Sequence, residues 1–458
     1  MTAMSASPDV SLADAAPPRA PLLARVLRSG GAGLAANLCS QALRLASNLV
    51  LTRLLYPEAF GLMAITQSIL MAARLLSDVG LSQSIVRSAR GHERSFCDTV
   101  WTLNILKDGS LFLVVCVAGP VAARLYHQPL LAQLVPAMAA TLLVAAFNST
   151  KLAVVNRRLE IGRLVLIELG AQACGIATMI AAAAAWRSPW ALVAGNWATA
   201  LALLAGSHLL LRGPANRFAW DRAAVREVMS FGGWVMLSSI VTFLLGEGSN
   251  LLNGWLVGPQ AVGFLGLSTN LALVAWSTIQ ALGGRVFYPA YAEVWRDRPA
   301  QLSRVLVRSR QAQLLGGCAV ALVWAVLGQR LVGLLYDPRY RVVGALLQIQ
   351  AVGTIFAFAS SSYANVLWAM GLGRLNVMLV AVQAASLFAL LVLGHHLGGL
   401  LGLMTASSFI GLCIYPVNAW VFRRLGLWHP RTDAAVFAVG ALAAAWVWAF
   451  GAWRALAP

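Results

Sequence analysis

A stripe of polar side chains runs along the first long apolar stretch of the sequence. It consists of Asn37, Gln41, Arg44 and Asn48, spaced four, three and four residues apart. In an α-helix this spacing places all four on one face over more than three turns. A charge at the centre of a lipid-facing helix costs about 2.5–3.5 kcal/mol on insertion scales. The stripe therefore predicts a face that lines a water-filled cavity.

The next two apolar segments also carry charges. The second contains Arg74 and Asp78, and the third contains Lys107 and Asp108. At about 1.5 Å of rise per residue, Arg44, Arg74 and Lys107 can share one layer in the middle to inner part of a membrane. Arg74 and Asp78 are four apart and can neutralise each other. Lys107 and Asp108 are adjacent, so we expect them to point in different directions and not to form a local pair.

A cationic layer in a hydrated cavity suits a ligand with a negatively charged head. Arginine binds phosphate through paired hydrogen bonds, so a diphosphate-linked lipid fits, with its head in the cavity and its tail in the membrane. The candidate substrate-binding residues are Arg44, Arg74, Lys107, Asn37, Gln41, Asn48 and Asn250. The candidates for coupling to H⁺ or Na⁺ are Asp78, Asp108, Glu168 and Glu247, although Glu168 could instead hydrogen-bond between helices. No other cofactor and no metal is expected.

Composition indicates what positions these residues. The chain has 458 residues, of which 59% are hydrophobic and 11% charged, and its mean hydropathy is +0.74. Apolar windows of about 20 residues, enough to cross ~30 Å of hydrocarbon, recur from residue 31 almost to the end. The predicted fold is an all-α polytopic membrane protein with about 13 (12–14) transmembrane helices. These helices are expected near 32–54, 60–79, 99–123, 130–149, 164–186, 189–211, 229–252, 260–283, 309–334, 343–366, 375–394, 398–422 and 433–454.

The distribution of positive charge sets the orientation. With the N-terminus in the cytoplasm, 24 of the 34 Lys and Arg residues fall in cytoplasmic segments, seven on the opposite side and three within spans. This asymmetry follows the positive-inside rule. The net charge of +18 is therefore explained by topology, and nucleic acid is not an expected partner.

A repeated turn indicates duplication. Residues 57–61 read "PEAFG" and residues 259–263 read "PQAVG", 202 positions later. At this offset Asn48 also aligns with Asn250. Both turns lie between two apolar stretches on the predicted non-cytoplasmic side, and six spans per unit give both halves the same orientation. Such parallel repeats occur in transporters whose halves rock about a shared central site.

The expected organisation follows from this repeat. It comprises a disordered cytoplasmic tail (1–30), an N-lobe of six helices (31–212), a cytoplasmic linker (213–228), a C-lobe of six helices (229–424) and a C-terminal helix (425–458), with two pseudo-repeated six-helix bundles around a central cavity.

The stretch 51–87 resembles the signature of the polysaccharide transporter, or oligosaccharide flippase, family. The likeness lies in "RLL" at 53–55, "PEAFG" at 57–61 and "DVGL" at 78–81, with "GPQAVGFLGLSTNL" (258–271) and "FYPAYAEV" (287–294) as matching landmarks in the second half. That family belongs to the multidrug/oligosaccharidyl-lipid/polysaccharide exporter superfamily. The resemblance implies two bundles forming a V-shaped cavity that moves undecaprenyl-diphosphate-linked glycans across the bacterial inner membrane. It also implies membrane lipids, and a polysaccharide polymerase with export machinery, as partners. Many relatives have fourteen helices.

Two other classes remain as alternatives. A drug/cation antiporter of the same superfamily would favour an acidic cavity, whereas this stripe is basic. A membrane-embedded polysaccharide polymerase or ligase usually needs clustered carboxylates or large catalytic loops. The chain has 16 acidic residues, no paired-carboxylate cluster, no long loop and no phosphate-binding GxxxxGK[ST] motif. The six cysteines form no CxxC motif. The sequence therefore predicts a transporter and not an enzyme.

Overall fold

The computed structural model describes residues 22–451 except 79–80, 82–83, 86–87, 89, 92, 158–160, 230–239, 241–242 and 283–286. Within these ranges the regular structure is helical, with no strand, which confirms the predicted fold class. Half of the predicted seventh helix, 229–252, and residues 1–21 of the predicted tail lie outside the described residues.

The helices fall into two sets along the chain. The first set is α1 (Leu22–Leu54), α2 (Pro57–Leu76), α4 (Arg94–Leu125), α5 (Leu131–Ala146), α6 (Lys151–Arg157), α7 (Ile161–Trp186) and α8 (Trp190–Leu209). A short helix at 222–229 follows. The second set is the π-helix η1 (Leu244–Gly248), α10 (Ser249–Leu282), α11 (Tyr288–Asp297), η3 (Pro299–Gln301), α12 (Leu302–Leu335), η4 (Pro338–Tyr340), α13 (Arg341–Phe358), α14 (Tyr363–Ala369), α15 (Gly373–Ser408), α16 (Ile410–Arg424) and α17 (Pro430–Phe450).

Nine helical segments in the described part of the chain are long and apolar enough to cross a membrane. Two of them contain a sharp break, at Gly258 in α10 and at Gly398–Gly399 in α15. Gly258 and Gly399 have positive φ values of 79° and 53°, which glycine adopts at little cost. Each break separates two helices that the sequence predicted as distinct, so the structure is consistent with about thirteen spans.

The first helix is longer than expected. α1 begins at Leu22, ten residues before the predicted start, so residues 22–30 of the predicted tail are helical. The sequence "LLARVLRS" explains this difference, because leucine and arginine are good helix formers and no proline interrupts the run.

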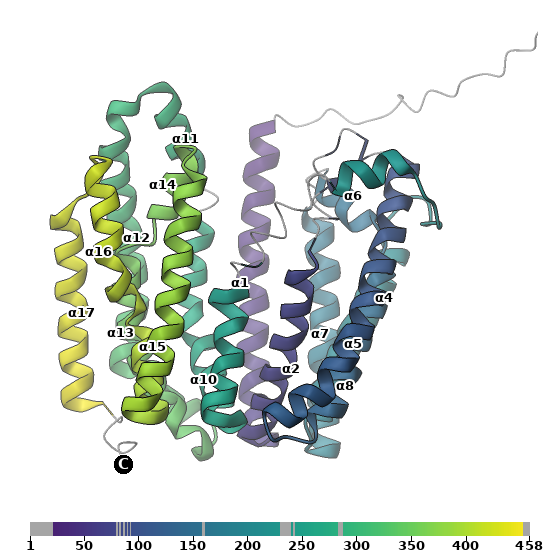
Figure 1. Ribbon diagram of the computed structural model, residues 1–458, viewed down its shortest axis with the longest axis horizontal. Coiled ribbons are helices and arrows are strands. Elements are labelled where there is room, and N and C mark those ends of the chain that lie inside the picture. Colours follow the sequence, from purple (N-terminus) through teal and green to yellow (C-terminus); the bar gives the residue numbers. More distant parts are fainter. Residues whose placement is uncertain are drawn as a thin grey trace, which may run out of the picture.

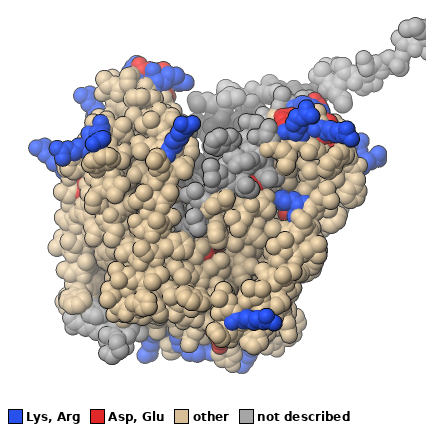
Figure 2. Space-filling model, viewed as in Figure 1, with Lys and Arg blue, Asp and Glu red and all other residues tan. Residues whose placement is uncertain are grey.

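The two sets form two bundles side by side (Figure 1). One contains α2, α4, α5, α7 and α8, and the other contains α12, α13, α15, α16 and α17, with α1 and α10 between them in this view. The bundles approach each other at the lower end of the figure and are farther apart at the upper end. Lys and Arg gather at both ends of the molecule, and the belt between the ends is almost free of charge on the face in Figure 2. This distribution suits a membrane-spanning body.

The repeated turns meet where the bundles converge. A Cβ atom added to Gly61 would collide with the carbonyl oxygen of Pro259, and one added to Gly263 would collide with the carbonyl oxygen of Pro57. Each glycine therefore lets the backbone of the other repeat approach closely, in a reciprocal contact. We call the contact between 57–61 and 259–263 the twin-turn seam.

Aromatic side chains reinforce the twin-turn seam. The ring of Tyr340 lies edge-on between the rings of Phe60 and Phe264, 6.1 Å from each. Its hydroxyl donates to the carbonyl oxygen of Leu55 at 2.9 Å. The Tyr126 hydroxyl donates to the carbonyl oxygen of Leu251 at 3.0 Å, which adds a second bond between the two sets of helices.

A buried ion pair fixes α17 to the second bundle. Arg310 and Asp433 are both 1% exposed and lie 2.5 Å apart, and the Tyr415 hydroxyl donates to the other carboxylate oxygen at 2.7 Å. Arg310, one of the 24 residues assigned to cytoplasmic segments from the sequence, is buried in the interior of this bundle. Because an unpaired buried charge is costly, loss of either partner alone would destabilise the docking of α17.

The seam predicts a sharp contrast between two glycines of the same helix. Gly263→Ala should lower the melting temperature of the purified protein, because its methyl group overpacks the seam by about 1–3 kcal/mol. Gly266→Ala should not lower it, since nothing lies within 4 Å of the added atom and alanine favours the helix. Equal melting temperatures for the two variants would contradict the close backbone contact.

Candidate functional site

The polar stripe on α1 lies partly against α7. The Ser40 hydroxyl donates to Oε1 of Gln172 at 2.7 Å, and Nε2 of Gln172 donates to the Ser40 carbonyl oxygen at 3.1 Å. Ser40 lies four residues before Arg44 and belongs to the same face, although the sequence analysis did not include it. The pair therefore fixes the rotation of α1 relative to α7.

The stripe residues are solvated to different extents. Asn37, Gln41 and Asn48 are half-buried, and Arg44 is exposed. Within the described residues, the Arg44 guanidinium forms no ion pair with an acidic side chain. Its charge is therefore available to a ligand, and a shared layer of the three cations stays a prediction.

Lys107 pairs with the carboxylate of Asp108, and Arg74 lies in the electrostatic field of the same group. Nζ of Lys107 lies 3.1 Å from Oδ1 of Asp108, and Arg74 lies within electrostatic reach of the same group. The expectation that the adjacent Lys107 and Asp108 would not pair is wrong, because the long lysine side chain curls back to its neighbour. Arg74, Lys107 and Asp108 together carry a formal net charge of +1.

A carboxylate of the second set reaches across to the first. The Ser68 hydroxyl on α2 donates to Oε2 of Glu247 at 2.5 Å, and Nδ2 of Asn250 donates to the same oxygen at 3.3 Å. Ser68 is 2% exposed and Glu247 is half-buried. Glu247 lies in the π-helix η1, and π-helical turns often occur at functional sites. Sequence spacing pointed to Glu247 and Asn250 but not to Ser68.

The two remaining acidic candidates are Glu168 and Asp78. Glu168 is exposed on α7, one turn before Gln172, and Asp78 is half-buried two residues after the end of α2. No group of three or more His, Cys, Asp or Glu side chains with the arrangement of a metal site occurs among the residues described.

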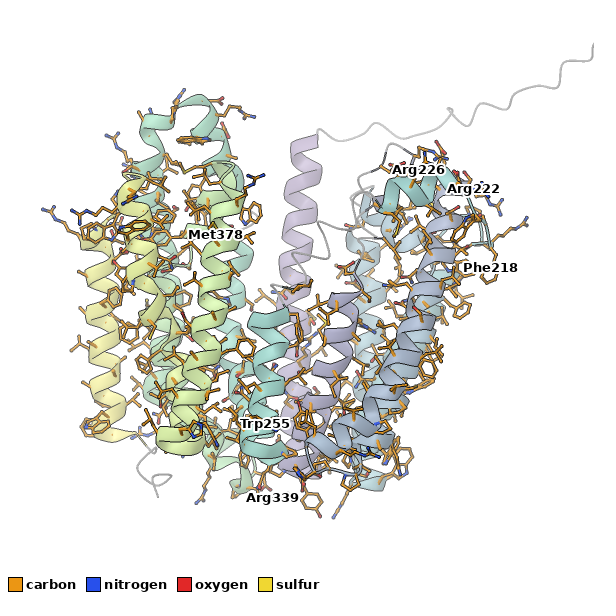
Figure 3. All side chains as sticks on the ribbon, in the orientation of Figure 1. Phe218, Arg222, Arg226, Trp255, Arg339 and Met378 are labelled. Carbon is orange, nitrogen blue, oxygen red and sulfur yellow. The ribbon has the colours of Figure 1, made fainter. Side chains whose placement is uncertain are left out.

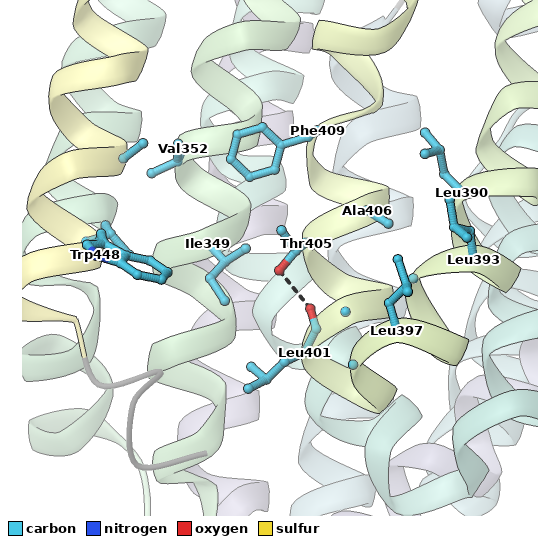
Figure 4. Close-up of a pocket in the computed structure, with 15 residues that line it drawn as sticks. Ile349, Val352, Leu390, Leu393, Leu397, Leu401, Thr405, Ala406, Phe409 and Trp448 are labelled. Carbon is cyan, nitrogen blue, oxygen red and sulfur yellow. Dashed lines mark hydrogen bonds between the residues drawn. The ribbon is translucent and has the colours of Figure 1, made fainter. Parts of the chain in front are cut away.

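An apolar pocket lies in the second bundle, away from the charged residues (Figure 4). It has a volume of about 600 Å³ and is lined by α13, α15 and α17, including Ile349, Leu397, Phe409 and Trp448. The hydroxyl of Thr405 is occupied, since it donates to the Leu401 carbonyl oxygen at 2.7 Å. The lining suits a hydrocarbon chain and offers nothing to a charged diphosphate.

Comparison with known proteins defines the class. The fold is similar to that of the lipid II flippase MurJ in an inward closed conformation, with a TM-score of 0.68, 10% identity and 88% of each chain covered. It is also similar to an inward-facing multidrug resistance transporter of the MATE family, with a TM-score of 0.67, 14% identity and coverage of 86% of this chain and 95% of that one. The chain therefore has the fold of multi-pass membrane transporters.

The sequence comparisons identify the family. Residues 50–343 match the model of the polysaccharide biosynthesis protein family, and the chain belongs to this family. The lipopolysaccharide biosynthesis protein WzxC of Escherichia coli (strain K12) is 22% identical over 404 residues, covering 83% of this chain and 80% of the relative. The resemblance found in the sequence is thus confirmed.

The bond between Ser68 and Glu247 predicts a measurable stabilisation of this conformation. Ser68→Ala should lower the melting temperature, because removal of the donor leaves the Glu247 carboxylate without its shortest hydrogen bond, at a cost of about 1–3 kcal/mol. Ser110→Ala is the control, since Ser110 is exposed and bonds only to the Lys107 carbonyl oxygen of its own helix. A Ser68 variant as stable as the Ser110 variant would show that the bond between the sets contributes nothing.

Proposed function

We propose that this protein is a flippase that translocates undecaprenyl-diphosphate-linked oligosaccharide or polysaccharide repeat units across the bacterial inner membrane by alternating access. The observation that carries the proposal is the exposed Arg44 without an acidic partner in the described chain, on a helix between two bundles joined at one end. The family and the names of WzxC and MurJ support a substrate in which a glycan is attached to a lipid.

The proposed cycle starts from the arrangement in the structure. The twin-turn seam, Tyr340 and the bond between Ser68 and Glu247 hold the bundles together at one end, so a substrate enters from the other. With the N-terminus in the cytoplasm, as the charge distribution predicts, entry is cytoplasmic and the seam lies on the opposite side. Export then requires the seam to open while the upper ends approach each other.

The chemistry of the head group determines the proposed binding residues. Arg44 can bind a diphosphate through paired hydrogen bonds, with Asn37, Gln41 and Asn48 on its own face as donors to phosphate or sugar oxygens. The cluster of Arg74, Lys107 and Asp108 adds a net positive charge. The two negative phosphates would therefore meet Arg44, which has no acidic partner among the described residues, with further positive charge nearby.

Coupling to H⁺ or Na⁺ is proposed to act at Glu247. Of the four acidic candidates, Glu247 has a described hydrogen bond to the other set of helices, whereas Asp108 is already paired with cations. Protonation would remove the charge that strengthens the bond from Ser68, and so would loosen the bundles. Asp78 and Glu168 remain secondary candidates. The proposal assigns no chemical reaction to the protein. Its proposed partners are a polysaccharide polymerase and export machinery.

A drug/cation antiporter is the second candidate, because the likeness to the MATE transporter is almost as high as that to MurJ. The charge of the N-terminal helices disfavours it. A cationic substrate would meet the positive charges of Arg44, Arg74 and Lys107, and Asp108 pairs with Lys107.

The proposal predicts that Arg44→Ala abolishes glycan export while membrane insertion and abundance stay normal. Glycan-loaded lipid carrier should accumulate on the inner leaflet, measured by labelling the glycan in sealed vesicles of defined orientation. Arg53→Ala is the control, because Arg53 is an exposed arginine of the same helix near its outer end and is expected to contact headgroups. Normal export by the Arg44 variant would remove the site assignment, and single repeat units found already translocated in a deletion strain would indicate a polymerase.

A further inference from the structure

The segment that connects the two lobes is docked onto the N-terminal bundle. Its backbone N–H groups donate to side chains at the start of α4: Arg217 to Asp98 Oδ1 at 3.2 Å, Ala219 to Thr102 Oγ1 at 3.1 Å and Asp221 to Thr99 Oγ1 at 3.1 Å. Nδ2 of Asn216 donates to Thr150 Oγ1 at 2.7 Å. Residues 216–221 are therefore a fixed part of this bundle, although the sequence indicated only a linker.

Two aromatic side chains of this segment face outward. Phe218 and Trp220 are 70% and 57% exposed. The ring of Phe218 rests on the buried ring of Trp101, with 5.1 Å between centroids, so contact with α4 holds it in its exposed position. Phe218 lies at the outer side of the bundle in Figure 3, below Arg222 and Arg226.

The segment also carries four exposed arginines: Arg212, Arg217, Arg222 and Arg226. In the part of the chain that the structure describes, none of the four forms an ion pair. Neighbouring carboxylates are engaged elsewhere, since Asp221 and Glu93 bind Arg90 at 2.7 and 2.8 Å. The hydrogen bond from Arg90 lowers the pKa of the Asp221 carboxyl below its ordinary value, so this pair stays ionised at neutral pH.

We propose that these six residues, Arg212, Arg217, Phe218, Trp220, Arg222 and Arg226, form a binding surface for the headgroups of anionic phospholipids. Aromatic side chains concentrate at membrane–water interfaces, and basic residues beside them attract anionic lipids. The surface lies at the end of the molecule predicted to be cytoplasmic, with the side chain of Phe218 nearer the apolar belt than Arg222 and Arg226. This binding surface is separate from the proposed glycan site, and its binding of lipid does not depend on the identity of the glycan.

The fixed position of the surface gives it a mechanical consequence. Because the segment is bonded to α4, lipids bound here hold the N-terminal bundle at the membrane surface while the other bundle moves. The hinge between the bundles must then lie after residue 221.

The test uses the full-length protein in neutral detergent, titrated with phosphatidylglycerol or phosphatidylcholine, with bound lipid counted by native mass spectrometry. Phosphatidylglycerol should bind more tightly. The double variant Arg222→Gln/Arg226→Gln should weaken its binding at least tenfold, since each basic residue near an anionic surface contributes about a fivefold change in affinity. Added salt should weaken phosphatidylglycerol binding by the parent protein more than binding by the variant.

The matched control is Arg304→Gln/Arg308→Gln, which removes two exposed arginines from the start of α12 in the other bundle. It should bind phosphatidylglycerol like the parent. The proposal would be overturned by parental affinity in the Arg222/Arg226 variant, by an equal loss in the control, or by equal binding of the two lipids. Such results would be expected if the surface instead served a protein partner. Export by the Arg44 variant bears on the flippase proposal alone, so the two proposals fail separately.

Discussion

The reciprocal contact between two glycines and two carbonyl groups is the constraint on which the arrangement of the bundles depends. Gly61 and Gly263 have no side chain, so the chain at each turn approaches the carbonyl oxygen of the proline in the other repeat. Any larger residue would force the backbones apart. The duplicated turn thus has a structural role that one copy could not have alone, since each repeat supplies both a glycine and the surface on which the other glycine packs.

Joining the bundles at one end determines where polar groups can be placed. Near the twin-turn seam the contacts are apolar and aromatic, through Phe60, Phe264 and Tyr340. Farther along the same helices, Ser68 and Glu247 form a polar contact between the two sets. Arg44 and the cluster around Asp108 lie on the N-terminal helices, so the positive charge belongs mainly to one bundle. An anionic head group would therefore bind asymmetrically, and a rocking motion would carry it with the N-terminal bundle.

The sequence predicted the membrane class, the family and the positions of most helices, because apolar windows and the "PEAFG" and "PQAVG" turns are local signals. It also placed both turns on one side of the membrane. It could not show that the turns touch, because contact depends on how two bundles pack. The pairing of Lys107 with Asp108 was missed because the spacing rule considers helix directions and ignores the reach of a lysine side chain. The docking of 216–221 was missed for a related reason: its bonds join backbone N–H groups to Asp98, Thr99 and Thr102, and sequence spacing carries no sign of them.

Opening of the twin-turn seam during transport can be measured by electron–electron double resonance. Spin labels at Arg124→Cys and Arg330→Cys, exposed positions near the same end of the two bundles, would be introduced after replacement of the exposed Cys39, Cys174 and Cys413. In membranes supplied with lipid-linked glycan, the distribution of distances between the two spin labels should show a second, longer population beside the one that corresponds to this structure. Gly263→Ala should increase that longer population without substrate. A single distance that is unchanged by substrate and by the Gly263 substitution would contradict an account in which the repeated turns part to release the glycan.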